Sequence, residues 1–246
     1  MSIARYSDLY EREPTHWWCQ GMGYITRSLV EGAGFAPGAR VLDAGCGAGG
    51  LALAWQGRYW IIGLDASRLA LDYACRRGVQ RALAGSVARL PFASAAFDLV
   101  VCLDVLYHEG VSDNRGALAE LRRVLRPGGR LLLRLPAYDW LRGPHDDRMG
   151  TGRRFTARSL RREMQEAGFS VERVTYANTL LFPLQAAWRL ARVGNGDDFI
   201  SVGAVLSRVL AGILSAEGRL LRRIDLPFGL SVYGLGRKPA EEGDRR

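Results

Sequence analysis

A glycine-rich run follows the first strongly apolar segment of the chain. Residues 41–50 read VLDAGCGAGG, with glycines at positions 45, 47 and 49 and a carboxylate at Asp43. Glycines let the backbone turn with unusual dihedral angles and approach a ligand closely. A carboxylate beside them would repel a pyrophosphate and attract a ligand that carries an ammonium and a sulfonium. The run therefore predicts a cofactor loop for a positively charged ligand.

A second acid occupies the matching place after the next apolar segment. Residues 60–67 read WIIGLDAS, which predicts a buried strand that ends at Asp65. An acid at the end of the strand after a glycine loop suits hydrogen bonds to the two hydroxyls of a ribose. The alternative is a helix N-cap for the run that begins at Ala66 and Ser67.

Three further segments follow in order. Residues 85–92 read GSVARLPF, residues 97–104 read FDLVVCLD, and residues 125–133 read LRPGGRLLL. Together with the glycine run and the strand that ends at Asp65, they resemble the motifs of class I S-adenosylmethionine (SAM)-dependent methyltransferases with a type 11-like domain. The resemblance implies SAM as the cofactor. It also implies an α/β fold with a Rossmann-like, seven-stranded, mostly parallel sheet and helices on both faces.

The resemblance assigns donor contacts to residues of this chain. Asp43 matches an acid near the amino-acid end of the donor, and the backbone of Gly45 and Gly47 matches groups that meet the methionine portion. The implied cofactor contacts are Asp43, Gly45, Cys46, Gly47, Asp65, Ala66, Ser86, Val87 and Leu103. Ser86 departs from the family, which commonly has an acid there for the adenine amino group. Its hydroxyl can accept that bond, or Ser86 is a surface loop residue; the backbone of Val87 can still read the purine edge.

The segment after the fourth predicted strand bears on the acceptor. Residues 103–108 read LDVLYH and lack the Asn/Asp-Pro-Pro-aromatic tetrad of enzymes that methylate amino groups of nucleic-acid bases. A hydroxyl, carboxyl, carbon or small amine acceptor therefore remains. Tyr107 is a candidate substrate-binding residue. His108 is a candidate catalytic residue, with a structural histidine as the alternative.

The loop after the fifth predicted strand offers a second histidine. His145 stands beside Asp146 and is a candidate general base, because a carboxylate can orient an imidazole and raise its basicity. A surface loop without catalytic duty is the alternative. The two residues are adjacent, which is poor spacing for metal ligands, so no metal is expected. The arginine-rich stretch that follows predicts an anion site, with Arg153 and Arg154 as substrate-binding residues.

The composition fits one globular domain. The 246 residues are 48% apolar, and no run reaches the roughly 18 uncharged apolar residues of a membrane span. Residues 1–13 have no apolar core, so we expect no secretion signal, and the four scattered cysteines fit a reducing cytoplasm. The formal net charge is +9, but Lys238 is the only lysine and the arginines are spread along the chain. A solvated basic surface is therefore expected rather than a nucleic-acid groove.

Apolar periodicity sets the expected organisation of this single domain. Strand-like and helix-like segments alternate from residue 17 to 178, with an N-terminal helical cap at 1–36. A helix is expected over residues 114–125, ended by the Pro-Gly-Gly at 127–129, and Thr156 is expected to cap the next helix. Strands over 169–176 and 230–238 enclose a helical insertion at 179–228, and 239–246 form a disordered tail. The insertion can cover its own domain, a substrate, a partner subunit or a lipid surface.

The sequence therefore predicts a cytoplasmic SAM-dependent methyltransferase that acts on an oxygen, carbon or nitrogen of a small-molecule or lipid-like acceptor. The expected acceptor is apolar and carries an anionic group. The alternatives are a non-catalytic scaffold or activator with the same fold, an RNA methyltransferase and an NAD-dependent dehydrogenase. Nucleic acid is not an expected partner, whereas peripheral membrane contact and a homo-oligomer stay open.

Overall fold

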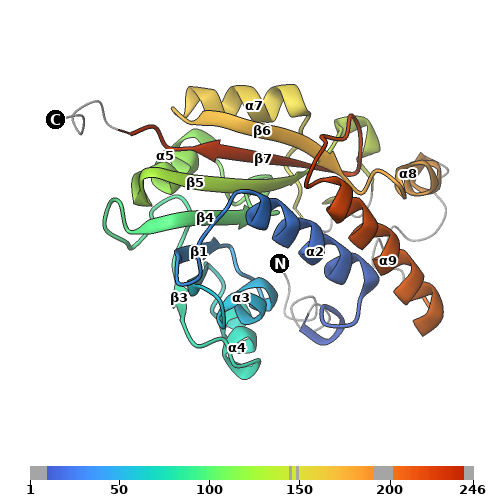
Figure 1. The fold of residues 1–246 in the computed structure, drawn as a ribbon, viewed down its shortest axis with the longest axis horizontal. Helices are drawn as coiled ribbons and strands as arrows, with labels where there is room; N and C mark the ends of the chain where they lie inside the picture. Colours follow the sequence, from blue (N-terminus) through green and yellow to red (C-terminus); the bar gives the residue numbers. More distant parts are fainter. Residues whose placement is uncertain (1–9, 144–145, 148–149, 191–201, 241–246) are drawn as a thin grey trace.

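Seven strands form one continuous sheet. The computed structural model describes residues 10–143, 146–147, 150–190 and 202–240. In this part of the chain the strand order is β3-β2-β1-β4-β5-β7-β6, and only the pairs that involve β7 are antiparallel. The strands are β1 (Arg40–Ala44), β2 (Trp60–Asp65), β3 (Ala82–Ala84), β4 (Phe97–Leu103), β5 (Leu125–Pro136), β6 (Ser170–Ala177) and β7 (Ser231–Arg237). The predicted seven-stranded, mostly parallel sheet is confirmed (Figure 1).

Helices cover both faces of the sheet (Figure 1). One layer contains α5 (Asn114–Val124) and α7 (Ala157–Glu166). The other contains α2 (Trp17–Gly32), α3 (Gly50–Trp55), α4 (Arg68–Arg76) and α9 (Ala204–Leu220), while η1 (Asp139–Leu141) and α8 (Phe182–Leu190) follow β5 and β6. Every residue of β4 except the last is buried. The two helical layers explain why residues 99–103 of this strand form a continuous apolar run in the sequence.

Capping residues fix where the helices begin. Ser67 caps α4, because its Oγ accepts a hydrogen bond from the Ala70 N–H at 3.3 Å. Thr156 caps α7 through a capping box with Ser159, as the sequence predicts. Each cap marks the point at which a loop from the carboxyl edge of the sheet turns into a helix. That edge is where ligands bind in open parallel sheets.

The junction of α5 and β5 differs from the prediction of a helix that runs to residue 125 and stops at a separate turn. α5 ends at Val124, and Leu125 already pairs with Phe97 of β4. The register then shifts, so that Leu99 pairs with Arg130. The Pro-Gly-Gly turn is therefore an irregularity inside one long strand, made possible by the positive φ of Gly128 (77°).

Both helices between β6 and β7 belong to the region expected to be an insertion. α9 packs along α2, and the two helices approach closely because Gly21 lies against Leu214. Glu217 of α9 is buried and accepts hydrogen bonds from the N–H groups of Thr179 and Leu180, at 2.9 Å each. One face of α9 thus covers its own domain. Near the start of the helix, the apolar side chains of Val205, Leu206 and Val209 are exposed.

Several predicted features lie outside the described residues. They are His145, residues 1–9 of the expected cap, residues 191–201 of the expected insertion and residues 241–246 of the expected tail. The division of the chain into cap, insertion and tail stays a prediction. Within the described ranges, no helix combines the length and the apolar character needed to cross a membrane.

Candidate functional site

The loop between β1 and α3 passes close under the segment that follows β4. Gly45 has a φ of 89°, and its N–H donates a hydrogen bond of 2.7 Å to the Leu64 carbonyl of β2. The N–H of Cys46 donates to the same carbonyl at 2.9 Å. A Cβ atom at position 45 would overlap the side chain of Val105. Glycine is therefore required there both by the left-handed backbone and by the lack of space.

Asp43 stands at the end of β1 as a buried carboxylate. It is 3% exposed, and its Oδ2 has no hydrogen-bond partner among the described residues. The pKa of Asp43 is raised to about 8. Burial is the largest cause, the negative charges of Glu13 and Asp65 raise the pKa further, and the positive charge of Arg134 lowers it. A buried carboxylate with an oxygen that accepts no hydrogen bond is unfavourable, and a bound cation would relieve that cost. The residues present therefore fit a positively charged ligand at this place.

Asp65, at the end of β2, ties the glycine loop to the start of α4. Its Oδ2 accepts a hydrogen bond from the Gly47 N–H and its Oδ1 accepts one from the Ser67 N–H, both at 2.9 Å. Ser67, rather than Asp65, is the N-cap of α4. Two carboxylate oxygens offer about four acceptor positions, so Asp65 keeps capacity for ribose hydroxyls.

The other implied donor contacts surround this loop. Val87 is buried in the core, Cys46 is buried under Gly63, and Leu103 is half-buried at the end of β4. Ser86 is exposed and its Oγ accepts a hydrogen bond from a backbone N–H of its own turn, at 3.2 Å. Ala66 is exposed. The structure places these residues around the loop, and their binding roles stay predictions.

A partly buried ion pair that sequence reasoning missed lies near the glycine loop. Nε of Arg134, in β5, donates to Oδ2 of Asp104 at 2.9 Å, and the ring of Trp18 lies 5.1 Å from the guanidinium carbon. The charge of Arg134 acts on Asp43 and also on Tyr107. The charge of Arg134 therefore reaches both the glycine loop and the segment after β4. Its signal in the sequence is a lone arginine within the apolar run of residues 131–135.

The segment after β4 is joined to the loop after β5 through backbone contacts. The N–H of Gly152 donates to the Tyr107 carbonyl at 2.8 Å, and His108 forms an isolated β-bridge with Thr151. Burial, and then the charge of Asp104, raise the pKa of the Tyr107 phenol above its usual value. Tyr107 is therefore a neutral hydrogen-bonding group. The structure brings Tyr107 and His108 to the expected edge of the sheet, while His145 lies outside the described residues.

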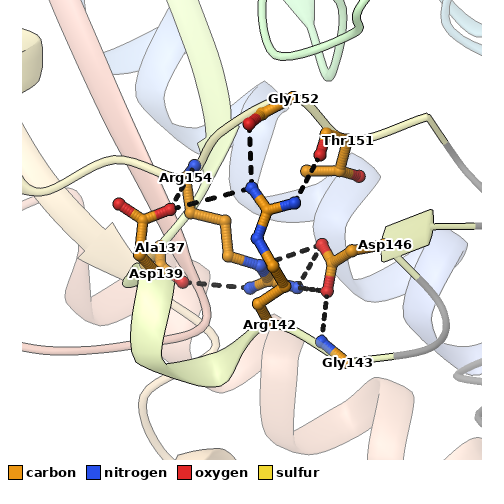
Figure 2. Close-up of polar contacts among 8 residues, drawn as sticks. All are labelled: Ala137, Asp139, Arg142, Gly143, Asp146, Thr151, Gly152 and Arg154. Carbon is orange, nitrogen blue, oxygen red and sulfur yellow. Dashed lines mark hydrogen bonds and ion pairs between the residues drawn. The ribbon is translucent and has the colours of Figure 1, made fainter.

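Arg153 and Arg154 are each paired with a carboxylate of the protein. Figure 2 shows Arg154 between Asp146 and the Ala137 carbonyl: Nε and Nη2 donate to the two carboxylate oxygens at 2.9 Å each, and Nη1 donates to Ala137 at 3.0 Å. Arg153 forms a second two-point pair with Glu163, at 3.0 and 2.7 Å. The predicted acceptor contacts of these arginines stay untested. The observed pairing supports a role in holding the loop instead.

No group of three or more His, Cys, Asp or Glu residues in the described ranges is arranged to hold a metal ion. The described groups that carry charge at this edge are Asp43, Asp65 and the Asp104–Arg134 pair, and they lie near the segment after β4. These groups suit the binding of a charged organic cofactor and the positioning of an acceptor. The fold and the glycine loop together resemble the α/β domain of class I methyltransferases.

Comparison with known proteins agrees with this class. Residues 42–133 match the family model described as a methyltransferase domain. The chain is 43% identical over 108 residues to the malonyl acyl-carrier-protein O-methyltransferase of Erwinia pyrifoliae, covering 42% of this chain and 40% of that relative. It is 38% identical over 109 residues to the demethylmenaquinone methyltransferase of a Mycobacterium species, covering 44% and 46%. These matches span less than half of either relative.

A solved structure extends the likeness to most of the fold. Phosphoethanolamine N-methyltransferase 2 of Haemonchus contortus, solved in complex with SAM, superposes with a TM-score of 0.60 at 17% identity. The superposition covers 87% of this chain and 52% of that one. Residues 42–133 therefore match a methyltransferase domain, and the likeness to this solved structure shows that the chain has the same fold.

Proposed function

We propose that this chain is a cytoplasmic enzyme that transfers a methyl group from SAM to a small-molecule or lipid-like acceptor. The observation that carries the proposal is the buried carboxylate of Asp43, whose Oδ2 lacks a partner among the described residues beside the glycine loop. A charge in that position is stabilised by a ligand of opposite charge. SAM carries both an ammonium and a sulfonium.

The chain's own residues would hold the donor and handle a proton. Asp43 and the backbone of Gly45 and Gly47 would hold the amino-acid end, and Asp65 the ribose. Bound SAM supplies an electrophilic methyl group for in-line displacement, so the protein chiefly orients the two reactants. Where the acceptor loses a proton, His108 is the candidate base among the described residues, and His145 remains a second candidate.

An apolar acceptor is supported by the surface at the carboxyl edge of the sheet. Trp140 is exposed there, with its ring 6.2 Å from that of Phe182, which lies 5.4 Å from the ring of Phe228. The names of the two relatives describe one enzyme for an acyl-carrier-protein thioester and one for a quinone precursor.

Calorimetric titration with SAM and with NAD tests the cofactor. We expect SAM to bind and NAD not to bind, and we expect Asp43→Asn to weaken SAM binding. Asp72→Asn, at an exposed position on α4, is the matched control and should bind as the wild type does. Binding of NAD alone would overturn the proposal in favour of a dehydrogenase.

Turnover separates an enzyme from a non-catalytic scaffold, because both would bind SAM. The assay measures formation of S-adenosylhomocysteine with panels of quinones, phenols, acyl thioesters and small amines. SAM binding without turnover in any panel or cell extract would favour the scaffold. An RNA acceptor would instead show binding that weakens steeply as the salt concentration rises.

A further inference from the structure

Residues 10–15 form a strap that lies against the glycine loop. Arg77, at the end of α4, pins the strap: its side chain is 7% exposed, forms an ion pair with Glu13 and donates to the Tyr10 carbonyl. The same guanidinium donates to the Ala48 carbonyl of the glycine loop at 3.2 Å and lies 4.6 Å from the centre of the Tyr10 ring. One buried arginine thus connects the strap to the loop.

The carboxylate of Glu13 contacts the backbone at the end of the glycine loop. A Cβ atom at Gly50 would overlap Oε1 and Oε2 of Glu13. Any residue other than glycine at position 50 would therefore push the carboxylate away from the loop. Arg77 pairs with Oε2, which leaves Oε1 on the side of Gly50.

Glu13 is also the strongest charged influence on Asp43. After burial itself, Glu13 contributes more than Asp65 to the raised pKa of Asp43. The negative charge of Glu13 thus reaches Asp43 beside the glycine loop, and Oδ2 of Asp43 is buried with no hydrogen-bond partner among the described residues. Arg77 offsets part of the charge of Glu13, and a cation between the two carboxylates would also stabilise the ionised form of Asp43.

We propose that Glu13 is a donor-binding residue, and that it and Asp43 together hold the ammonium of SAM, so that the strap and the donor stabilise each other. The inference rests on the proposed function. An ammonium has three N–H donors and can bridge two carboxylates by hydrogen bonds, whereas a sulfonium has none. Glu13 forms the outer wall of the site and Asp43 the inner wall.

Glu13→Gln tests the proposal when its affinity is measured by calorimetry for three ligands. SAM and S-adenosylhomocysteine both carry the ammonium, and 5′-methylthioadenosine lacks it. We expect the substitution to weaken SAM and S-adenosylhomocysteine about tenfold each, since a hydrogen bond to a charged group contributes about 1.5 kcal/mol. The affinity for methylthioadenosine should not change. Glu11→Gln, at an exposed position of the same strap, is the control and should bind all three ligands as the wild type does.

Three results would overturn the inference. They are unchanged SAM affinity in Glu13→Gln, an equal loss for methylthioadenosine, which would mean that Glu13 only packs the strap, and a loss for SAM alone, which would assign Glu13 to the sulfonium. Failure of the wild type to bind SAM is a different result, because it contradicts the proposed function itself. A thermal unfolding curve of each variant checks that the fold is intact.

Discussion

Arg154 and Asp146 form a two-point ion pair that water barely reaches, with side chains 3% and 2% exposed. The same aspartate accepts a hydrogen bond from the Gly143 N–H at 2.9 Å, and the Arg154 N–H donates to Oδ1 of Asp139 at 3.0 Å (Figure 2). The pair fastens the loop after β5 to the chain just before α7. It therefore sets the position of the backbone that meets Tyr107 and His108.

Removal of this pair should destabilise the protein. Arg154→Ala leaves the carboxylate of Asp146 buried without its cation, which typically costs about 3–5 kcal/mol. A thermal melt should show a fall in Tm of about 10 °C. Arg162→Ala is the matched control, because its pair with Glu166 is exposed (71% and 61%) and should change Tm little. Equal melting of the two variants would contradict the structural role of Arg154.

The raised pKa of Asp43 makes stability depend on pH. Its pKa is about 8 in the folded protein against 3.8 for the ordinary group, because burial and then the charges of Glu13 and Asp65 raise it more than Arg134 lowers it. Between these values the folded state holds a proton that the unfolded state has lost. The free energy of unfolding should therefore fall as the pH rises from about 4 to about 8 and then level off. Denaturant titration across this range measures the slope, and Asp43→Asn should reduce it.

Binding of the donor should release a proton from the same group. A bound cation favours the charged carboxylate, so the pKa of Asp43 falls on binding and SAM affinity rises with pH up to about 8. Calorimetry at about pH 7 in two buffers of different ionisation enthalpy counts the released proton. A heat of binding that is the same in both buffers would contradict the prediction.

The glycine at position 45 can be tested against one with the same backbone but more space. Gly45 and Gly38 have φ values of 89° and 83°, but only at Gly45 would a Cβ meet another side chain, that of Val105. Alanine should cost about 1–2 kcal/mol at both positions for the left-handed backbone. At position 45 it should cost about 1–3 kcal/mol more and also weaken SAM binding. Denaturation and calorimetry measure the two effects, and equal behaviour of the two variants would show that Val105 yields.

Glu217 should be important for the attachment of α9. Its carboxylate accepts hydrogen bonds from the N–H groups of Asn178, Thr179 and Leu180, although burial raises its pKa. Glu217→Gln would turn an amide N–H toward these donors and should cost about 3 kcal/mol. Thermal unfolding measures the loss, with Glu166→Gln at an exposed site as the control. A Tm unchanged by Glu217→Gln would show that the three N–H groups find other acceptors.

Most of the fold could be predicted from local patterns. The strand ends at Ala44, just after Asp43, and at Asp65, and the cap at Thr156, depend on residues close in sequence, so the sequence reveals them. The start of β5 was harder to predict from the sequence, because the pairing of Leu125 with Phe97 needs two distant segments to meet. The strand pairing of Leu125 with Phe97 outweighs the helix propensity of leucine at this position.

The candidate site divides in the same way. The glycine loop and its two acids belong to short motifs, whereas the partners of charged side chains depend on the fold. Arg153 and Arg154 look like an anion site in the sequence, since their carboxylates stand ten and eight residues away. The effect of Glu13 on Asp43 and the burial of Arg134 could be recognised only in the folded structure. Each depends on segments that are far apart in the sequence.

The packing of α2 on α9 bears on how the site assembles during synthesis. Arg222, just after α9, forms an ion pair with Glu31 of α2 across 191 residues of sequence. α2 is synthesised early, whereas α9, which covers part of its apolar face, is synthesised near the end of the chain. Contacts of such separation slow folding. We therefore expect a nascent chain that has not reached α9 to lack the donor site, even when the glycine loop and all of β1 to β5 have been made.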